Sequence, residues 1–350
     1  MPKSIDVRGR TIGDGAPCFI IAEAGVNHNG DLELARELVH VAASVGADAV
    51  KFQTFRANHL VNRDAPQADY QRRNMGEAVS QYEMLCRLEL TESAHVELIA
   101  ECRKLGLTFL STPFDEPSAD LLDRLDVPAF KVPSGEITNL PFLDYLARKG
   151  RPLILSTGMS TLGEVEAAVR TVVDAGNDRL VLLHCVSNYP AMPADVNLRA
   201  METMRTSFGV PVGYSDHTLG NSIGWAATAL GARVIEKHFT LDRNLPGPDH
   251  AASLEPLELG AFIEGVRSVE SALGDGRKRP AASEANTAAV ARKSLVTSRP
   301  IASGMRITAD CLSIKRPGTG LPPDMRKLVL DRTARCDIPA GTLLSLEMLR

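Results

Sequence analysis

The sequence has few cysteines, and none of them are spaced for a paired role. Six cysteines are scattered over 350 residues, and no two form a Cys-x-x-Cys pair. This spacing argues against a zinc ribbon and against a disulfide framework, because both need paired cysteines. Scattered single thiols are typical of a reducing compartment, so we expect a cytoplasmic protein.

Long apolar runs and an excess of positive charge are also missing. No run of about 18 apolar residues predicts a membrane span, and the first ten residues, MPKSIDVRGR, lack the apolar core of a signal peptide. The formal net charge is −4, from 39 basic and 43 acidic residues. We therefore expect neither nucleic acid nor an anionic membrane as a partner.

The sequence does contain a regular alternation of short apolar runs, which predict buried strands, and segments with helical spacing. The predicted strands lie at 18–23, 47–53, 107–112, 128–134, 152–157, 179–185, 210–215 and 232–240. The predicted helices lie at 31–45, 91–105, 116–125, 140–149, 161–175, 197–207, 221–231 and 255–273. Eight strand–helix repeats favour a closed α/β fold, the (β/α)₈ or TIM barrel. An open doubly wound sheet is the alternative, but no glycine-rich dinucleotide fingerprint follows the first strand.

The character of the sequence changes after the last predicted helix. We expect residues 1–273 to form the barrel, preceded by a small hairpin at 4–14. Residues 274–293 are polar, small and basic, and predict a linker. Residues 294–350 hold the β-like runs SLVTS, MRITAD, LSIKR and ARCDIPAGTLLS, and predict a compact β-rich domain. So small a domain encloses little core, and we expect it to lean on a partner surface.

Ionisable side chains stand where buried strands end, most clearly in ARVIEKHFT at 232–240. This strand runs into Glu236, Lys237 and His238, and alternation turns Lys237 away from the other two. Polar groups also end the other strands, at Glu23, Lys51, Gln53, Thr112, Lys131, Ser134, Glu136, Ser156, Thr157, His184, Ser215 and His217. In a barrel these strand ends meet at one mouth, which is where active sites form.

His217 and His238 end the seventh and eighth predicted strands, which are neighbours in a closed barrel. Imidazoles on adjacent strand ends can share one divalent metal ion; the alternative is two ordinary hydrogen-bonded histidines. We expect no cysteine nearby and several carboxylates, a setting that suits Mn²⁺ with water or substrate as further ligands.

Two lysines, Lys51 and Lys131, also stand at strand ends, among the hydroxyls of Thr112, Ser134 and Ser156. A cationic set rich in hydroxyls predicts a site for a phosphate or carboxylate anion. A Schiff-base lysine is the rival interpretation, since barrel aldolases place lysine at similar positions. Two lysines amid hydroxyls favour anion binding, because a Schiff-base lysine needs a drier site.

An ordered series of motifs runs along the chain: IAEAGVNHNGD (21–31), KFQTF (51–55), STPFD (111–115), KVPSGE (131–136), ILSTGM (154–159), HCVSNYP (184–190), GYSDHT (213–218), EKHFT (236–240), PGPDH (246–250) and IKRPGTG (314–320). This series resembles the sialic acid synthase family, which makes N-acetylneuraminate and the bacterial legionaminic and pseudaminic acids. The resemblance covers nearly the whole chain. Its C-terminal part is similar to the family's antifreeze-like (SAF) domain.

The resemblance implies an enzyme that condenses phosphoenolpyruvate with an N-acetylmannosamine-type aldehyde. The products would be phosphate and a nine-carbon 2-keto acid. A diacetamido-hexose, giving legionaminic or pseudaminic acid, is the alternative sugar. The motif GVNHNG and the segment QADYQ…SQYEMLCRLEL resemble the neuraminate and legionaminate branch more than the pseudaminate branch.

The resemblance also implies roles for individual residues. The catalytic residues would be Glu23, Lys51 and Lys131. The residues that bind phosphoenolpyruvate would be Lys51, Thr112, Lys131, Ser134, Ser156, Ser187 and Ser215. The residues that bind the sugar would be Gln53, Glu136, Tyr189, Asp249 and Arg316. The metal, expected to be Mn²⁺, would be held by His217 and His238.

One position departs from the family, and one implied role crosses between subunits. Ser187 stands where some members have asparagine, although a hydroxyl can still donate to a phosphate. Arg316 matches an arginine that reaches the sugar in the other subunit, which implies a domain-swapped homodimer. Three other functions stay open: a Schiff-base pyruvate aldolase, a non-catalytic binding protein, and a related synthase that takes a sugar phosphate.

Overall fold

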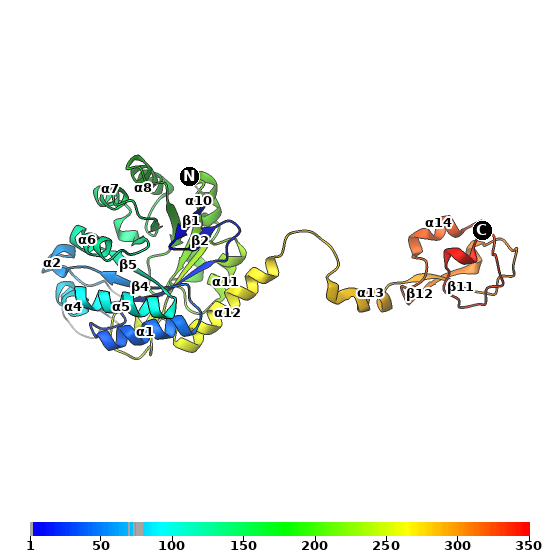
Figure 1. Cartoon of the computed structure of the whole chain (residues 1–350), viewed down its shortest axis with the longest axis horizontal. Coiled ribbons are helices and arrows are strands. Elements are labelled where there is room, and N and C mark those ends of the chain that lie inside the picture. The colour runs from blue at the N-terminus through cyan, green and yellow to red at the C-terminus, as the bar shows by residue number, and fades with distance from the viewer. Residues whose placement is uncertain (1–2, 69–70, 73, 75–79) are drawn as a thin grey trace. The chain divides into compact units, whose positions relative to one another are not determined.

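A closed barrel of parallel strands forms the larger part of the protein (Figure 1). This computed structural model describes residues 3–68, 71, 72, 74 and 80–350. Within these residues the barrel strands are β3 (Phe19–Gly25), β4 (Ala49–Thr54), β5 (Thr108–Pro113), β6 (Phe130–Val132), β7 (Leu153–Ser156), β8 (Leu180–Cys185), β9 (Val212–Asp216) and β10 (Val234–His238). Strand β10 pairs with both β9 and β3, which closes the barrel. The predicted (β/α)₈ barrel is confirmed, and the open sheet is wrong.

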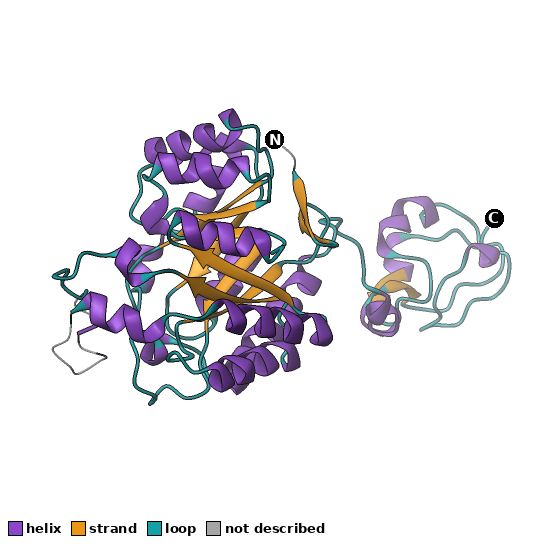
Figure 2. Cartoon of the chain, turned by 60° about the vertical axis from the view of Figure 1, so that its left-hand side comes forward, coloured by secondary structure: helices purple, strands orange, loops and turns teal. Residues whose placement is uncertain are grey.

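Helices surround the strands, as Figure 2 shows. The outer helices are α1 (Leu32–Ser44), α5 (Glu92–Leu105), α6 (Glu116–Arg124), α7 (Leu140–Arg148), α8 (Leu162–Asp174), α10 (Ala200–Phe208), α11 (Ser222–Ala229) and α12 (Pro256–Leu273). Short elements in the loops are α2 (Ala57–Leu60), α4 (Gln81–Leu88), η1 (Ser134–Glu136), α9 (Pro193–Val196) and η2 (His250–Ala252). Part of the polar segment at 67–90 lies outside the described residues.

Side-chain caps explain where several of these helices begin. The Asp31 carboxylate accepts hydrogen bonds from two backbone N–H groups in the first turn of α1, and the Thr91 hydroxyl caps α5 as predicted. The helix expected at 197–207 begins later, at Ala200. The delay follows from Asn197, whose φ of 50° is left-handed and interrupts the helical path.

The apolar core lies in two layers and leaves the carboxyl ends of the strands to polar groups. The larger layer fills the space between strands and helices. A second cluster fills the amino-terminal end of the barrel, where the hairpin of β1 (Ser4–Val7) and β2 (Arg10–Gly13) adds Ile5, Val7 and Ile12. The carboxyl end of the barrel is therefore the end available for chemistry.

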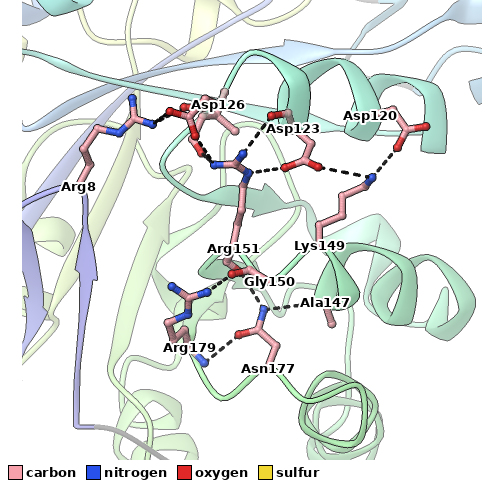
Figure 3. A network of polar contacts seen from close by, with 11 residues as sticks. Arg8, Asp120, Asp123, Asp126, Ala147, Lys149, Gly150, Arg151, Asn177 and Arg179 are labelled. Carbon is pink, nitrogen blue, oxygen red and sulfur yellow. Dashed lines mark hydrogen bonds and ion pairs between the residues drawn. The ribbon is translucent and has the colours of Figure 1, made fainter.

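A polar network ties together the loops at the amino-terminal end of the barrel (Figure 3). The guanidinium of Arg151 donates to the carboxylates of Asp123 at 2.6 Å and Asp126 at 2.9 Å. Arg8, from the hairpin, pairs with Asp126 on its other side, and Lys149 pairs with Asp120. These contacts join the ends of α6 and α7 to the hairpin. They lie at the amino-terminal ends of the strands, away from the carboxyl ends.

The chain divides into two compact units, Met1–Gly274 and Asp275–Arg350. The described elements of the second unit are η3 (Ala282–Glu284), α13 (Ala285–Ala291), β11 (Ser294–Thr297), η4 (Ala309–Cys311), β12 (Leu312–Lys315), η5 (Pro323–Met325), α14 (Arg326–Val329) and η6 (Leu346–Met348). Strands β11 and β12 pair antiparallel. The segment expected as a linker therefore contains a helix, α13.

The structure corrects two expectations about this C-terminal unit. Two of the four β-like runs form isolated bridges in place of strands, such as those joining Arg306 to Thr333 and Ala334 to Leu349. The unit also has an apolar core of its own, built around Leu295, Ile307 and Leu344. Turns bring short runs together around this core, which is why single bridges replace long ladders.

Candidate active site

A cavity of about 440 Å³ opens at the carboxyl ends of the barrel strands. It brings together most of the residues singled out from the sequence. These are Glu23, Lys51, Gln53, Thr112, Lys131, Ser134, Ser156, Ser187, Tyr189, Ser215, His217, His238 and Asp249. They come from all eight strand ends or the loops that follow, so the barrel closure itself assembles the site.

The floor of the cavity is a buried cluster of two lysines and two glutamates. Lys51 Nζ lies 2.8 Å from Glu23 Oε2 and 3.7 Å from Glu236 Oε2. Lys131 Nζ lies 3.7 Å from the other oxygen of Glu236. All four side chains are at most 5% exposed, so their charges interact strongly. The cluster therefore places two ammonium groups side by side at the base of the cavity.

Hydroxyl groups complete the contacts of this cluster. Lys51 donates to Thr112 Oγ1 at 3.0 Å, and Lys131 donates to Ser156 Oγ at 2.7 Å. The Ser215 hydroxyl donates to Glu236 Oε1 at 2.8 Å. Glu236 thus binds both lysines and a serine, a bridging role that the sequence analysis missed although it noted this residue at a strand end.

The two glutamates have different pKa values because their surroundings differ. Burial raises the pKa of Glu23 to about 7, although Lys51 partly opposes the rise. Burial acts on Glu236 in the same direction, but Lys131, Lys51 and the Ser215 hydroxyl outweigh it and lower its pKa to about 2. Glu236 is therefore a fixed anion near neutral pH, whereas Glu23 can take up and release a proton.

The two histidines lie together at the side of the cavity formed by β9 and β10. Their ring centroids are 5.4 Å apart, and the Tyr189 ring packs on His217 with centroids 4.1 Å apart. His217 Nδ1 donates to the Val186 carbonyl oxygen at 2.8 Å, which leaves Nε2 with a free lone pair. Among the described residues, His238 Nδ1 is buried and has no hydrogen-bond partner. Each ring thus has a nitrogen that can act as a ligand, although the effect of burial on His217 is outweighed by Cys185, which raises the pKa of His217.

The donor set fits a divalent ion with open coordination positions. Burial holds the pKa of His238 well below its usual range, so this ring is neutral, as a metal ligand must be. In the described part of the chain, no group of three histidine, cysteine, aspartate or glutamate side chains is arranged to hold a metal. Two imidazoles would therefore leave most ligand positions to water and substrate.

One expectation about the histidines is wrong, because a cysteine lies beside them. Cys185 Sγ is 3.7 Å from His217 Nδ1 and also 3.7 Å from the Ser134 hydroxyl. The sequence placed Cys185 at the end of β8 but gave no sign that it faces the cavity. His184, its neighbour, faces away and donates from Nε2 to the Val196 carbonyl.

The backbone of Gly158 lies close to the hydroxyl groups of Ser134 and Ser187, which line the cavity. Gly158 N donates to Ser134 Oγ at 2.9 Å. A Cβ at position 158 would lie 2.3 Å from Ser187 Oγ and 2.8 Å from Ser134 Oγ. Only glycine lets these two predicted anion-binding hydroxyls come together here.

An apolar wall also lines the cavity, in the segments that follow β3, β4 and β5 and on α4, and the sequence analysis did not foresee it. It is formed by Val26, Phe55, Leu60, Val61, Met84, Leu85, Leu88 and Phe114. Three of these residues come from α4, where helical spacing is equally typical of an ordinary core face. Among the described residues that line the cavity, the only lysines or arginines are Lys51 and Lys131.

Two predicted site residues are not among those that line the cavity. Glu136 lies in η1, and its Oε2 accepts a hydrogen bond from Asn139 Nδ2 at 2.7 Å. Arg316 belongs to the C-terminal unit, where it is exposed in the loop after β12. This loop is well held within its unit, because Gly318 N donates to the Ala289 carbonyl at 2.7 Å.

A parallel barrel with a buried lysine–glutamate cluster at its carboxyl mouth, followed by a small C-terminal unit, defines a (β/α)₈ enzyme with an accessory domain. The chain belongs to the NeuB family, which matches residues 38–278, and its residues 292–350 match the SAF domain. The resemblance inferred from the motifs is confirmed. The chain is therefore an enzyme, and the non-catalytic alternative is wrong.

Individual relatives agree with this assignment. The chain is 49% identical to the N,N'-diacetyllegionaminic acid synthase of Legionella pneumophila, over 96% of this chain and 95% of that protein. It is also 49% identical to the synthase of the same name from Campylobacter jejuni, over 87% and 91%. The crystal structure of N-acetylneuraminic acid synthetase from Leptospira borgpetersenii, in complex with citrate, superposes with a TM-score of 0.72. It is 35% identical, and the match covers 82% of this chain and 95% of that one.

None of the helices in the described part of the chain combines the length and the apolar character that crossing a bilayer requires.

Proposed function

We propose that the chain joins phosphoenolpyruvate to the aldehyde of an N-acyl amino sugar, giving a nonulosonic acid and phosphate. The observation that carries this proposal is the buried cluster of Lys51, Lys131, Glu23 and Glu236 in a cavity that is also lined by the imidazoles of His217 and His238. The two ammonium groups suit a phosphate and a carboxylate, which phosphoenolpyruvate carries together. Family membership supports the same reaction class.

Residues of the cavity would transfer protons and stabilise charge as bonds form and break in this reaction. The methylene carbon of phosphoenolpyruvate attacks the aldehyde carbon, so a carbon–carbon bond forms and the carbonyl π bond breaks. The aldehyde oxygen takes up one proton and becomes a hydroxyl, which balances the proton that is released when water adds in the next step. Water then adds to the carbon that carries the phosphate, and Glu23, whose pKa is about 7, takes the proton that this water releases. The bond from that carbon to the phosphate oxygen breaks, a ketone forms, and the hydroxyl proton leaves with phosphate. Lys51 and Lys131 stabilise the charge on the leaving phosphate.

We assign the metal to His217 and His238, and propose Mn²⁺ as the ion. Two imidazoles with carboxylates nearby suit an ion of intermediate hardness that keeps water or substrate ligands. When bound, such an ion would supply Lewis-acid polarisation of the aldehyde oxygen. His217→Ala should abolish turnover and remove the metal while the barrel stays folded, because the imidazole faces the cavity and supports no core packing. Full activity in this variant would refute the assignment.

For the sugar we propose a diacetamido-hexose in place of the N-acetylmannosamine-type aldehyde given first from the sequence. Two relatives at 49% identity are named for a diacetyl product. The apolar wall of the cavity suits acyl and deoxy groups. A sugar phosphate would need a second basic subsite, and the described cavity residues offer no lysine or arginine beyond Lys51 and Lys131.

Phosphate release from phosphoenolpyruvate tests the proposal directly. The sugars to compare are N-acetylmannosamine, its 6-phosphate and the diacetamido-hexose that would give N,N'-diacetyllegionaminic acid. We expect the highest kcat/KM with the diacetamido-hexose. A preference for the 6-phosphate would overturn the sugar assignment alone, whereas no phosphate release with any of the three would overturn the reaction.

We also propose a homodimer in which Arg316 of one chain completes the cavity of the other. The exposed loop that carries Arg316 is held by backbone contacts, and Ser294 Oγ also donates to the Pro317 carbonyl at 2.7 Å. In the barrel unit, Met159, Met192 and Leu219 are 60–73% exposed on loops that follow β7, β8 and β9. Exposed apolar side chains around an active-site mouth suit a protein partner.

A further inference from the structure

A second fully buried ion pair lies behind the histidines, on the outer face of the barrel wall. Lys237 Nζ of β10 is 2.9 Å from Asp216 Oδ2 of β9, and the two side chains are 1% and 0% exposed. The lysine also donates to the Thr218 carbonyl oxygen. None of the reaction steps proposed above uses either charge.

Strand alternation places this pair directly behind the cavity. Asp216 stands between Ser215 and His217, and Lys237 stands between Glu236 and His238; these four flanking residues all line the cavity. The pair must therefore face the helices. A Cβ on Gly224 of α11 would lie 3.3 Å from Asp216 Oδ2, which places the carboxylate against that helix.

Asp216 also shapes the turn that carries His217. Its Oδ1 accepts hydrogen bonds from the Thr218 backbone N–H at 2.9 Å and from the Thr218 hydroxyl at 2.7 Å. Its Oδ2 accepts from Lys237, which is the direct register partner of Asp216 in the ladder between β9 and β10. One carboxylate thus fixes the backbone on both sides of His217 and ties it to the strand that carries His238.

Stability alone does not explain this arrangement. Two charges removed from water lose hydration that their mutual attraction only roughly repays, and apolar side chains of similar volume commonly stabilise a core as well. A charged pair differs from an apolar pair because its hydrogen bonds are directional and fix one geometry. The Lys237–Asp216 pair lies behind both His217 and His238, so the geometry that it fixes is that of the strand ends carrying these two rings.

We propose that the Lys237–Asp216 pair is a positioning device that holds His217 and His238 in the arrangement that binds one divalent metal ion. The pair acts through the backbone and touches neither metal nor substrate, so its members are positioning residues. This inference rests on the metal site proposed above. Supports of this kind behind metal ligands are worth about 10–100-fold in metal affinity.

The test is a titration of the full-length protein with Mn²⁺ alone, with free Mn²⁺ measured by electron paramagnetic resonance. The double variant Asp216→Leu/Lys237→Met removes both charges and leaves neither unpaired. We expect its Kd for Mn²⁺ to rise by about 10–100-fold, with circular dichroism like that of the natural protein. Leu143→Ala, a core change in α7 at a fully buried position, is the matched control. It should lower the melting temperature and leave Mn²⁺ affinity unchanged.

The outcomes separate the two proposals. If the natural protein binds Mn²⁺, His217→Ala does not, and the double variant binds as the natural protein does, the positioning role is wrong and the metal site stands. Equal loss of affinity in Leu143→Ala also overturns the positioning role, because affinity then follows stability. Absence of saturable Mn²⁺ binding in the natural protein overturns both proposals.

A second variant covers the case in which the double variant does not fold. Asp216→Asn/Lys237→Met keeps an oxygen acceptor for the Thr218 N–H and loses only the tie to β10. It should weaken Mn²⁺ binding in the same direction, and natural affinity in this folded variant would refute the proposal.

Discussion

Glu23 and Glu236 are the same kind of side chain, yet the cavity gives them different chemistry. Glu236 lies close to both lysines and a serine hydroxyl, which hold it ionised. Among the described residues, Glu23 pairs with one lysine, Lys51, and accepts a hydrogen bond from Gln53 Nε2 at 3.4 Å, and burial dominates its pKa. The difference arises from which lysines each strand end reaches. Glu236 at the end of β10 lies near Lys51 of β4 and Lys131 of β6. Glu23 of β3, in contrast, lies beside Lys51 on the adjacent strand.

This difference predicts the pH dependence of the reaction. A general base acts when deprotonated, so kcat/KM should rise as the pH increases through about 7, where Glu23 loses its proton. Glu23→Gln should remove this limb and lower kcat by about 10²–10⁴-fold. Glu236→Gln should lower activity but keep a limb, displaced to lower pH, because the charge of Glu236 helps to raise the pKa of Glu23. A limb that persists unchanged in Glu23→Gln would assign the base elsewhere.

The two lysines can be tested for anion binding against Schiff-base chemistry. Lys51→Met and Lys131→Met each remove a charge-assisted contact worth roughly 1.5–3 kcal/mol. The KM for phosphoenolpyruvate should then rise by about 10–150-fold if the contact is equally strong in ground and transition states. Borohydride added with substrate should trap no covalent adduct. Unchanged phosphoenolpyruvate kinetics in both variants, or a trapped adduct on either lysine, would favour the aldolase interpretation.

At the scale of elements, the barrel was predictable because several of its strands are continuous apolar runs between turn signals, and the others carry short apolar runs at the same regular spacing. Such runs arise when both faces of a strand are buried, as in β8 (Leu180–Cys185). The strand ends also located most of the site, since parallel strands in a barrel share one mouth. The closure of β10 onto β3 then explains why residues distant in sequence meet.

Some features of the site could not be predicted from the sequence, because they depend on side-chain direction and on packing between distant elements. Cys185 and Glu236 stood at strand ends, but their partners could be identified only from the folded barrel. Met84 and Leu88 on α4 have the spacing of a core helix, which hides their second role in lining the cavity. The C-terminal unit was predicted as a small β-rich SAF domain, which is confirmed. Two of its runs were expected as strands but form isolated bridges, which leave no periodic pattern in the sequence.

The Arg151 network at the amino-terminal end of the barrel should stabilise the folded protein but have no effect on catalysis. Arg151→Ala should lower the free energy of unfolding by about 1.5–3 kcal/mol, because it leaves the carboxylates of Asp123 and Asp126 without this partner. The Michaelis constants should stay unchanged, since Arg151 precedes the amino-terminal end of β7, whereas Ser156 at the carboxyl end of that strand lines the cavity. Denaturant unfolding and steady-state kinetics on the same preparation test both statements.

A neighbouring arginine provides the control for this stability prediction. Arg148 pairs with Asp144 one turn away on α7, and its side chain is 64% exposed. Exposed pairs of this kind contribute about 0–1 kcal/mol, so Arg148→Ala should change stability far less than Arg151→Ala. Equal losses in the two variants would show that the network adds nothing beyond surface charge.

At the scale of the whole molecule, the two units offer complementary features. The barrel presents a cavity with exposed apolar side chains on the loops around it, and the C-terminal unit presents an exposed guanidinium on a well-held loop. A guanidinium recognises acyl and carboxylate oxygens, which the proposed sugar carries. In a closed two-fold dimer each chain gives and receives the same contact, so the proposed exchange would satisfy both units at once.

Complementation between two inactive variants tests this exchange. Arg316→Ala should be inactive because its sites lack the arginine, and His217→Ala because its sites lack the metal ligand. In a mixed dimer, one site combines the barrel of the Arg316→Ala chain with the arginine of the other chain, and this site is intact. Mixing should therefore restore activity, up to half that of the natural protein per mixed dimer. Differently tagged chains, co-purified to prove that subunits exchanged, provide the control. If proven mixed dimers stay inactive, Arg316 acts within its own chain or has no part in the site, and the swapped arrangement is wrong.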